Sequence, residues 1–347
     1  MSIESPSAES LQRARAIHAE APAIDLHADT LMWASWVDYD LLRRHEAPLP
    51  RSAFFGHVDV PRLREGGIGA QYFGLVSVPI GNIGNRGVID RQIDALDGAI
   101  ERARRDGVAF AKCDDAGDVD AAKDSASIGA LLGIEGAHAL DGDLDNVAHF
   151  ARRGVRYLGI LHFSANKAGF PAFGRGRRDS EGLTTWGKTL VGACEDNGVI
   201  VDLAHVNKRG WMDACELAAH PMYCTHTGVV GVYEHWRNVD DEQLRTLANN
   251  GGAAGVIFCP KFLGGDGFEP VVKHLRHMID VGGEDLPALG SDWDGMIVPT
   301  KGLGDATGVP WLTAALLEAG IEERIVRKIL RENALRVLRG AKARARA

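Results

Sequence analysis

Short apolar runs alternate with longer amphipathic stretches along most of this chain. We interpret the apolar runs as strands, at residues 22–27, 70–78, 128–134, 157–161, 199–203, 222–225, 253–258 and 287–290. Helical patterns fill most of the intervals, at residues 90–105, 144–152, 185–197, 208–219, 240–249 and 270–281. Strands that alternate with helices indicate a parallel α/β sheet, and eight of them would close a (β/α)8 TIM barrel. A doubly wound sheet is the alternative, but no GxGxxG motif follows the first strand.

The pattern predicts a single domain over residues 1–347, because no repeat or low-complexity linker divides it. Two more helical stretches, 310–319 and 322–337, follow the last strand and would form extra C-terminal helices. We interpret residues 1–20 as an N-terminal extension and residues 339–347, which are small and basic, as a frayed tail.

Residues of the metal-ligand type stand where six of the predicted strands end. They are His27, Asp29, Glu135, His162, His205, His226 and Asp292. The carboxyl ends of the strands of a barrel share one face, which is where barrel enzymes carry their chemistry. One histidine at a strand end is usually an ordinary loop residue, but seven such residues on one face predict a metal site.

The set suits two ions. A catalytic zinc ion uses about three protein ligands, so five ligands serve two ions only if one of them bridges. Glu135 has two oxygens and lies near the middle of the set. We therefore expect two zinc ions per chain that share a hydroxide near neutral pH. One ion would be held by His27, Asp29 and Glu135, and the other by Glu135, His205 and His226.

Two members of the set would act on the substrate. Asp292 follows the last strand and would serve as the general base that passes a proton to the leaving group. His162 would donate a hydrogen bond to the carbonyl oxygen as that oxygen gains charge.

Composition narrows the class of protein. The formal net charge is −8, from 39 basic and 47 acidic residues, which argues against nucleic acid as a partner. The first 22 residues contain no apolar segment typical of a signal peptide, and no apolar run is long enough to span a bilayer. The five cysteines are scattered without a CxxC pair, which favours reduced thiols and a cytoplasmic location.

The ordered motifs resemble the membrane dipeptidase (renal dipeptidase) family of the amidohydrolase superfamily. The resemblance covers residues 24 to about 338 and rests on DLHADT, HVDVPRLREGGIGAQYF, GIEGAH, RYLGILHFSAN, GLTTWGKTLV, VDLAHV, THT, RNVDDEQL, GSDWDG and ENALRVL. It implies a TIM barrel with a binuclear zinc site that hydrolyses dipeptides, some with a D-residue at the C-terminal position. It places the same five ligands, with Glu135 as the bridge, and assigns acid/base chemistry to Asp292 and carbonyl contact to His162.

The resemblance also implies two features of the substrate pocket. Arg237 falls on the arginine that holds the C-terminal carboxylate of the dipeptide, and a planar guanidinium fits a carboxylate through two parallel hydrogen bonds. Cys259 stands where the family commonly has a tyrosine, which leaves the preferred side chains open. The lipid anchor of the membrane form has no counterpart in this sequence, so no membrane partner is expected.

Other functions stay open at this point. The same metals could hydrolyse a β-lactam, a lactone or an N-acyl amino acid, and a catalytically silent barrel could serve as a binding subunit. A homo-oligomer is possible. His138 could orient a ligand or be structural, Asp294 could support the site or belong to a turn, and His274 with His277 would lie on a solvated helix face.

Overall fold

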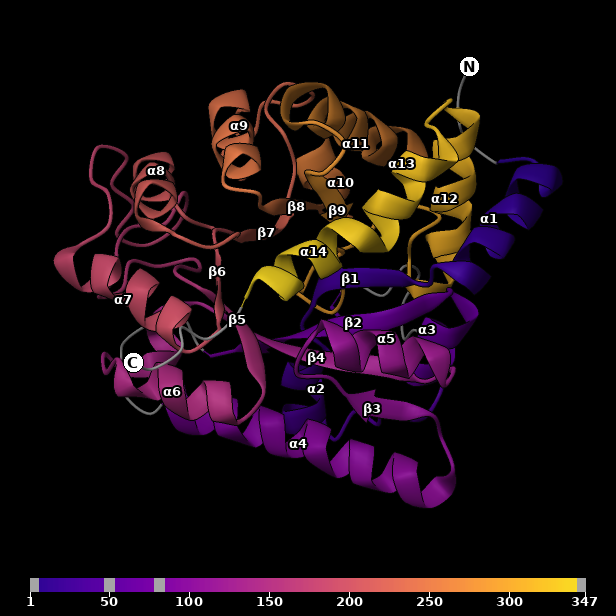
Figure 1. Ribbon diagram of the computed structural model, residues 1–347, viewed down its shortest axis with the longest axis horizontal. Helices are drawn as coiled ribbons and strands as arrows, with labels where there is room; N and C mark the ends of the chain where they lie inside the picture. The colour runs from indigo at the N-terminus through magenta and orange to yellow at the C-terminus, as the bar shows by residue number, and fades with distance from the viewer. Residues whose placement is uncertain (1–5, 47–53, 78–84, 342–347) are drawn as a thin grey trace.

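The computed structural model describes residues 6–46, 54–77 and 85–341. Eight parallel strands close a barrel, in the spatial order β2-β1-β9-β8-β7-β6-β5-β4, and the pairing of β2 with β4 completes the ring (Figure 1). They are β1 (Ala23–Ala28), β2 (Ile68–Val76), β4 (Ile128–Glu135), β5 (Val155–Gly159), β6 (Ile200–Asp202), β7 (Tyr223–Thr227), β8 (Ala253–Val256) and β9 (Pro287–Leu289). The predicted TIM barrel and its eight strands are confirmed, although residue 78 of the second predicted strand lies outside the described residues.

One strand was not predicted. β3 (Phe110–Lys112) pairs with the first half of β4, on the edge where β5 takes over further along. It has three residues, which is too short for a periodic pattern to identify it.

Large side chains fill the inside of the barrel. Tyr72, Tyr157 and Tyr223 lie with their ring centroids 5.2–6.5 Å apart, and all three are almost completely buried. Gly133 on β4 makes room for one of them, because a Cβ atom there would lie 2.0 Å from the ring of Tyr157. The barrel is therefore a packed core and its open end lies at the carboxyl ends of the strands.

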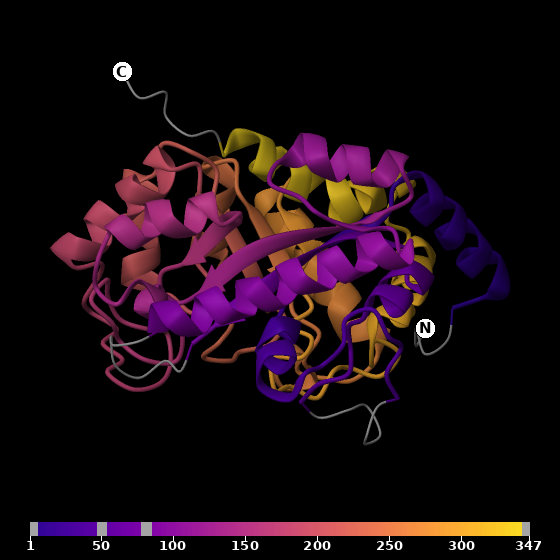
Figure 2. The ribbon, with the colours of Figure 1, turned by 90° about the horizontal axis from the view of Figure 1, so that it is seen from below.

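The helices surround this barrel (Figures 1 and 2). The predicted ones appear as α4 (Asn85–Asp106), α6 (Asp145–Arg152), α7 (Thr185–Asp196), α8 (Lys208–Leu217), α9 (Asp241–Asn249), α11 (Phe268–Gly282) and α12 (Val309–Glu318). The long C-terminal helix is divided into α13 (Glu323–Arg327), a π-helical turn (Lys328–Glu332) and α14 (Asn333–Gly340). Short helices that the pattern did not predict are α2 (Thr30–Val37), α3 (Val60–Glu65), α5 (Ala116–Asp124) and α10 (Pro260–Leu263).

The N-terminal segment is part of the folded unit. Residues 8–20 form α1 (Ala8–Glu20), which packs along α12 at the edge of the molecule (Figures 1 and 2). Nε2 of His18 on α1 lies 2.8 Å from the hydroxyl of Thr313 on α12, and Arg13 forms an ion pair with Glu323. At the other end, α14 continues to Gly340, so the first two residues of the predicted tail, 339 and 340, are helical, and residues 342–347 lie outside the described residues.

Candidate metal centre

The structure brings all seven predicted residues to the carboxyl end of the barrel. His27 lies on β1, Glu135 ends β4 and His226 lies on β7, while the other four stand within three residues after the ends of β1, β5, β6 and β9. Three groups of these side chains place their ligand atoms within 4.8 Å of one another. The groups are His27–Glu135–His226, Glu135–His162–His205 and His27–Asp29–Asp292, and every member is buried.

Glu135 is the centre of the cluster. Its Oε1 atom lies 2.9 Å from Nε2 of His205, 3.5 Å from Nε2 of His226 and 3.8 Å from Nε2 of His27. Its other oxygen, Oε2, lies 3.4 Å from Nε2 of His162. One carboxylate therefore contacts histidines from both predicted ligand sets, as a bridging group would have to do.

Several atoms of the cluster lack ordinary partners. Nε2 of His27 and Oδ1 of Asp29 are buried 3.3 Å apart, and neither has a hydrogen-bond partner in the part of the chain that the structure describes. Gly74 on β2 leaves space for this pair, because a Cβ atom there would lie 2.3 Å from Asp29 Oδ1. Buried polar atoms almost always have partners. Nitrogen and carboxylate oxygen atoms left open around one point are a donor set that fits divalent metal ions such as zinc.

The buried carboxyl groups of the cluster also favour a bound cation. Burial, followed by the charge of Asp29, raises the pKa of Glu135 well above its usual value, and burial raises the pKa of Asp292 to about 7. Burial lowers the pKa of His27, but the carboxylates of Asp29 and Glu135 outweigh it and raise this pKa to about 10. Three carboxyl groups thus share a buried site that a divalent cation would neutralise.

Hydroxyl groups contact two of the histidines at Nδ1, the ring nitrogen that points away from Glu135, and orient both rings. Nδ1 of His27 lies 2.7 Å from the hydroxyl of Tyr157 on β5. Nδ1 of His226 lies 3.0 Å from the hydroxyl of Thr225, which donates to Asp202. Both rings therefore turn Nε2 toward Glu135. These supporting residues are not recognisable in the sequence, because nothing in their spacing distinguishes them.

The backbone is strained at the site. His205 and Asp292 have φ values of 65° and 61°, in the left-handed region that non-glycine residues seldom adopt. Asp294 follows with a φ of 63°. Such conformations cost roughly 1–3 kcal/mol each and cluster at functional sites, where the surrounding fold holds them in place.

A cavity of about 660 Å³ opens over the cluster. His162, His205, Arg237 and Asp292 are among the polar side chains that line it. The rest of the wall is mostly apolar: Met32, Trp36, Val76, Phe163, Cys259, Pro260, Phe262, Met296, Ile297 and Val298. Cys259 thus lies in the cavity wall, as its alignment with the family tyrosine predicts.

Arg237 reaches the edge of the cluster. Its side chain is buried, and Nη2 donates to the backbone oxygen of His226 at 2.7 Å and lies 3.5 Å from Nε2 of His205. The guanidinium has further N–H groups that these contacts do not use. It can therefore stay anchored beside β7 while it binds an anion in the cavity.

The residues whose roles the sequence left open form hydrogen bonds that connect parts of the fold. Asp294 accepts hydrogen bonds from the hydroxyl of Thr30 and the backbone nitrogen of His57, and so ties the loop after β9 to α2. Nε2 of His138 lies 2.9 Å from the hydroxyl of Ser164. His274 corrects our expectation of a solvated face, because it is fully buried and accepts a hydrogen bond from the backbone of Val229.

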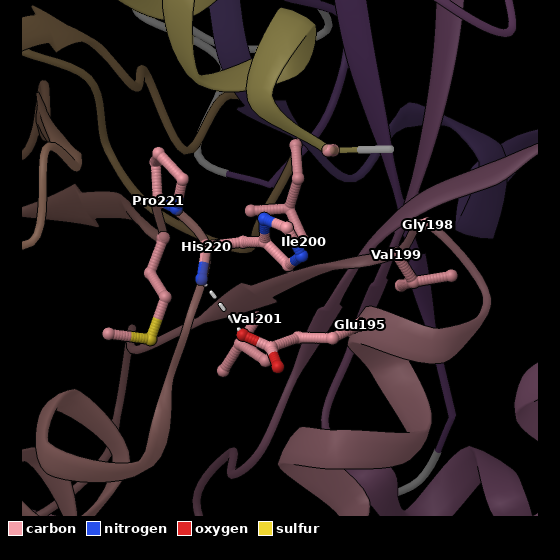
Figure 3. A pocket seen from close by; sticks show the side chains of 9 residues that line it. Glu195, Gly198, Val199, Ile200, Val201, His220 and Pro221 are labelled. Carbon is pink, nitrogen blue, oxygen red and sulfur yellow. Dashed lines mark hydrogen bonds between the residues drawn. The ribbon is translucent and has the colours of Figure 1, made fainter. Parts of the chain in front are cut away.

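A second hollow lies at the opposite end of the barrel (Figure 3). It is lined by the start of β6 and the turn before β7, where Glu195 accepts hydrogen bonds from the backbone nitrogens of Ala219 and His220. Its volume is about 10 Å³, which is room for about one water molecule and too little for an organic substrate.

Comparisons with known proteins identify relatives of this chain. The chain matches the family described as membrane dipeptidase (peptidase family M19) over residues 11–347. It is 32% identical to dipeptidase tcpJ of Claviceps purpurea over 329 residues, which are 91% of this chain and 76% of that protein. It is also 32% identical to an uncharacterized protein in the pqqA 5′ region of Klebsiella pneumoniae, over 65% of this chain and 87% of that protein.

Solved structures give the same picture. A metallopeptidase from Rhodobacter sphaeroides, crystallised with a phosphinate mimic of the dipeptide L-Ala-D-Ala, is 28% identical and superposes with a TM-score of 0.80 over 92% of this chain and 99% of that one. The probable dipeptidase PvdM from Pseudomonas aeruginosa superposes with a TM-score of 0.87 over 97% of this chain and 99% of that one. Its identity is 15%, so it supports the fold alone.

Proposed function

The chain belongs to the membrane dipeptidase family of metallopeptidases, and from that premise we propose that it hydrolyses the peptide bond of free dipeptides at a binuclear zinc site. The observation that carries the proposal is the position of Glu135 between two sets of ligand atoms, on the floor of the cavity that Arg237 lines. The phosphinate mimic bound to the Rhodobacter sphaeroides relative supports a dipeptide as substrate, including one with a D-residue at its C-terminus.

The proposed ligand roles draw on all three groups of the cluster, which overlap at His27 and Glu135. His27, Asp29 and Glu135 would hold one zinc ion, and Glu135, His205 and His226 the other. When bound, such an ion pair supplies hydroxide near neutral pH and polarises a carbonyl group. The oriented histidines and the open oxygens of Asp29 and Glu135 support this assignment.

Asp292 is the proposed general acid and base. Its Oδ1 atom lies 3.9 Å from Nε2 of His27, and its carboxyl group lines the cavity. From there it can take a proton from the attacking water and give it to the amine that leaves. Asp292 thus stands on the β9 side of the cluster, two strands along the barrel from β7, where Arg237 is anchored.

His162 and Arg237 are the proposed substrate contacts. His162 would donate to the carbonyl oxygen of the scissile bond as negative charge develops on it, because its side chain lines the cavity beside Glu135. Arg237 would bind the C-terminal carboxylate of the dipeptide through the N–H groups that its backbone contact leaves over.

The cavity wall favours apolar side chains on the dipeptide. Trp36, Met296 and Val298 form part of the wall around the polar floor. Among the described residues that line the cavity, Lys261 and Arg237 are the cationic ones. Burial of apolar surface contributes about 25 cal/mol per Å², so such a wall favours leucine- or phenylalanine-sized residues over glycine. The C-terminal position faces a wall that contains Cys259 in place of the family tyrosine.

A substrate panel tests the proposal. Zinc-loaded protein is incubated with dipeptides of L,L and L,D configuration, N-acyl amino acids, lactones and a β-lactam, and each product is quantified. We expect release of free amino acids from apolar dipeptides to be fastest, and the variant Asp292→Asn to abolish most of it. Faster hydrolysis of N-acyl amino acids or lactones would replace the dipeptidase assignment, and no hydrolysis of any substrate would favour a silent binding barrel.

We also propose a cytoplasmic location without a membrane or nucleic-acid partner. The five cysteines are free thiols, as is typical of a reducing compartment. Among the described residues, the structure holds no helix with the length and apolarity needed to cross a bilayer. Fractionation of cells that express the tagged protein tests the location.

A further inference from the structure

His27 contacts a residue that none of the proposed roles includes. Its Nδ1 atom lies 2.7 Å from the phenolic oxygen of Tyr157, and both side chains are fully buried. The opposite ring nitrogen, Nε2, is the atom that faces Asp29 at 3.3 Å. One ring nitrogen of this imidazole therefore points to the proposed metal site, and the other contacts a tyrosine inside the barrel.

The contact determines where the ring proton lies. A metal ion binds a nitrogen lone pair, so Nε2 of His27 must be unprotonated and the proton of the neutral ring must be on Nδ1. Nδ1–H then donates to the oxygen of Tyr157. Without that acceptor, Nδ1–H would be buried without a partner, which is unfavourable.

Tyr157 is held where this contact requires it. Its ring fills the space above Gly133 and lies 5.2 Å from the ring of Tyr72, centroid to centroid. The phenol comes from β5, across the barrel interior from His27 on β1. Packing fixes the hydroxyl before any ion arrives, which is the condition for a supporting group to orient a ligand.

The other ligand set has a support of a different kind. The hydroxyl of Thr225 donates to Oδ2 of Asp202, so its lone pairs are available to Nδ1–H of His226 at 3.0 Å. Asp202 is fully buried and also accepts from the backbone nitrogen of Thr225. Nδ1 of His226 thus contacts a hydroxyl that is hydrogen-bonded to a carboxylate, whereas Nδ1 of His27 contacts a neutral phenol.

We propose that Tyr157 is a positioning residue that fixes the tautomer of His27 and so strengthens one metal position selectively, while Thr225 and Asp202 do the same for the other position. This rests on the two metal positions of the proposed function. Each support touches one histidine of one ligand set. The two positions are therefore tuned separately, although Glu135 joins them.

The test measures bound metal rather than turnover. Wild type, Tyr157→Phe and Thr225→Val are loaded with zinc and dialysed against graded concentrations of a chelator, and ions per chain are counted by elemental analysis. We expect Tyr157→Phe to lower the affinity for one ion about 10–100-fold and to leave the other unchanged, the usual effect of losing such a support. Thr225→Val should weaken the other ion, and the double variant both.

Tyr72→Phe is the matched control. It removes a hydroxyl from the same buried cluster, and among the described residues that hydroxyl makes no hydrogen bond to the ligand set. It should retain both ions as wild type does. Two ions bound equally well by wild type and Tyr157→Phe would overturn the role of Tyr157 and leave the proposed function intact. Wild type without metal would overturn both.

A second measurement does not depend on a variant. ¹⁵N NMR of histidine-labelled, zinc-loaded wild type reports which ring nitrogen carries the proton. We expect the His27 signal to show a protonated Nδ1 that is hydrogen-bonded. A His27 ring that is protonated on Nε2, or that binds zinc through Nδ1, would overturn the proposal even if Tyr157→Phe does not fold.

Discussion

The Nε2 atoms of His205 and His226 lie 3.0 Å apart, and both face the same oxygen of Glu135. Burial lowers the pKa of each ring well below the usual value, so both are neutral. Two ligands of one tetrahedral zinc ion, with Zn–N distances of about 2.0–2.1 Å, stand about 3.3 Å from each other. The pair is therefore close to the spacing that one shared cation requires.

The bridging position of Glu135 leads to the first prediction. Glu135→Gln should release both ions, because an amide offers one neutral oxygen where the carboxylate reaches two ligand sets. Zinc content per chain, measured after gel filtration, checks it. Glu195→Gln is the control, since it changes a buried glutamate at the other end of the barrel and should keep two ions. A fully active Glu135→Gln protein with one ion would refute the bridge.

Asp292 supports a second prediction. Asp292→Asn should keep the fold and most of the zinc but lower kcat by roughly 10²–10⁴-fold, the range that a general acid or base contributes. The amide keeps the shape of the carboxyl group and loses its ability to accept and return a proton. Steady-state kinetics with parallel metal analysis measures this. Unchanged turnover in the zinc-loaded variant would remove Asp292 from the proton path.

The sequence predicted the parts of this site that depend on strand ends. Each ligand candidate follows an apolar run, and a parallel barrel brings all such ends to one face, so His27, Glu135 and His226 meet although they are far apart in the chain. The sequence did not reveal Tyr157 or Thr225, because an inward-facing strand residue looks the same whether its hydroxyl supports a ligand or fills the core.

Short helices without a clear hydrophobic period could not be predicted from the sequence either. α2 has eight residues and α10 has four, so both are too short to show the repeated hydrophobic spacing that identifies a helix. We expected His274 on a solvated face. The helix pattern gives no sign that the backbone N–H of Val229, in a neighbouring loop, needs a hydrogen-bond acceptor inside the fold. Such needs arise from tertiary packing.

His18 supports a prediction about pH and stability. Burial lowers its pKa from 6.5 to about 4, so the folded protein keeps this ring neutral where the unfolded chain would protonate it. Stability is then fully present above pH 6.5 and falls as the pH drops from about 6.5 to about 4, by an amount on the order of 3 kcal/mol. Urea unfolding of wild type and His18→Asn at several pH values measures this contribution.

The expected difference has a clear sign. The free energy of unfolding should fall more steeply with acid in wild type than in His18→Asn, and the partly exposed His220→Asn should behave as wild type. Parallel curves for wild type and His18→Asn would mean that α1 is not docked through this histidine. α1 would then belong to the N-terminal extension that we expected for residues 1–20.

Arg237 supports the last prediction, which concerns the length of the substrate. Its guanidinium is buried, and Nη2 is fixed to the backbone oxygen of His226, one of the residues of the metal cluster. A carboxylate bound to the remaining N–H groups would therefore lie close to the proposed metal positions, one residue beyond the scissile bond. A longer peptide would place a neutral amide against Arg237 instead.

With that geometry, we expect the protein to select for the free acid. A buried charge left without a partner costs several kcal/mol, so amidation of the C-terminus of a good dipeptide should lower kcat/KM by orders of magnitude. In Arg237→Ala the rate on the free acid should fall and the preference for acid over amide should disappear, while Arg237→Lys should restore part of it. Zinc content should be unchanged in both variants. Equal kcat/KM values of wild type for a dipeptide and its amide would exclude Arg237 as the anchor, and hydrolysis of lactones or N-acyl amino acids would then become the leading assignment.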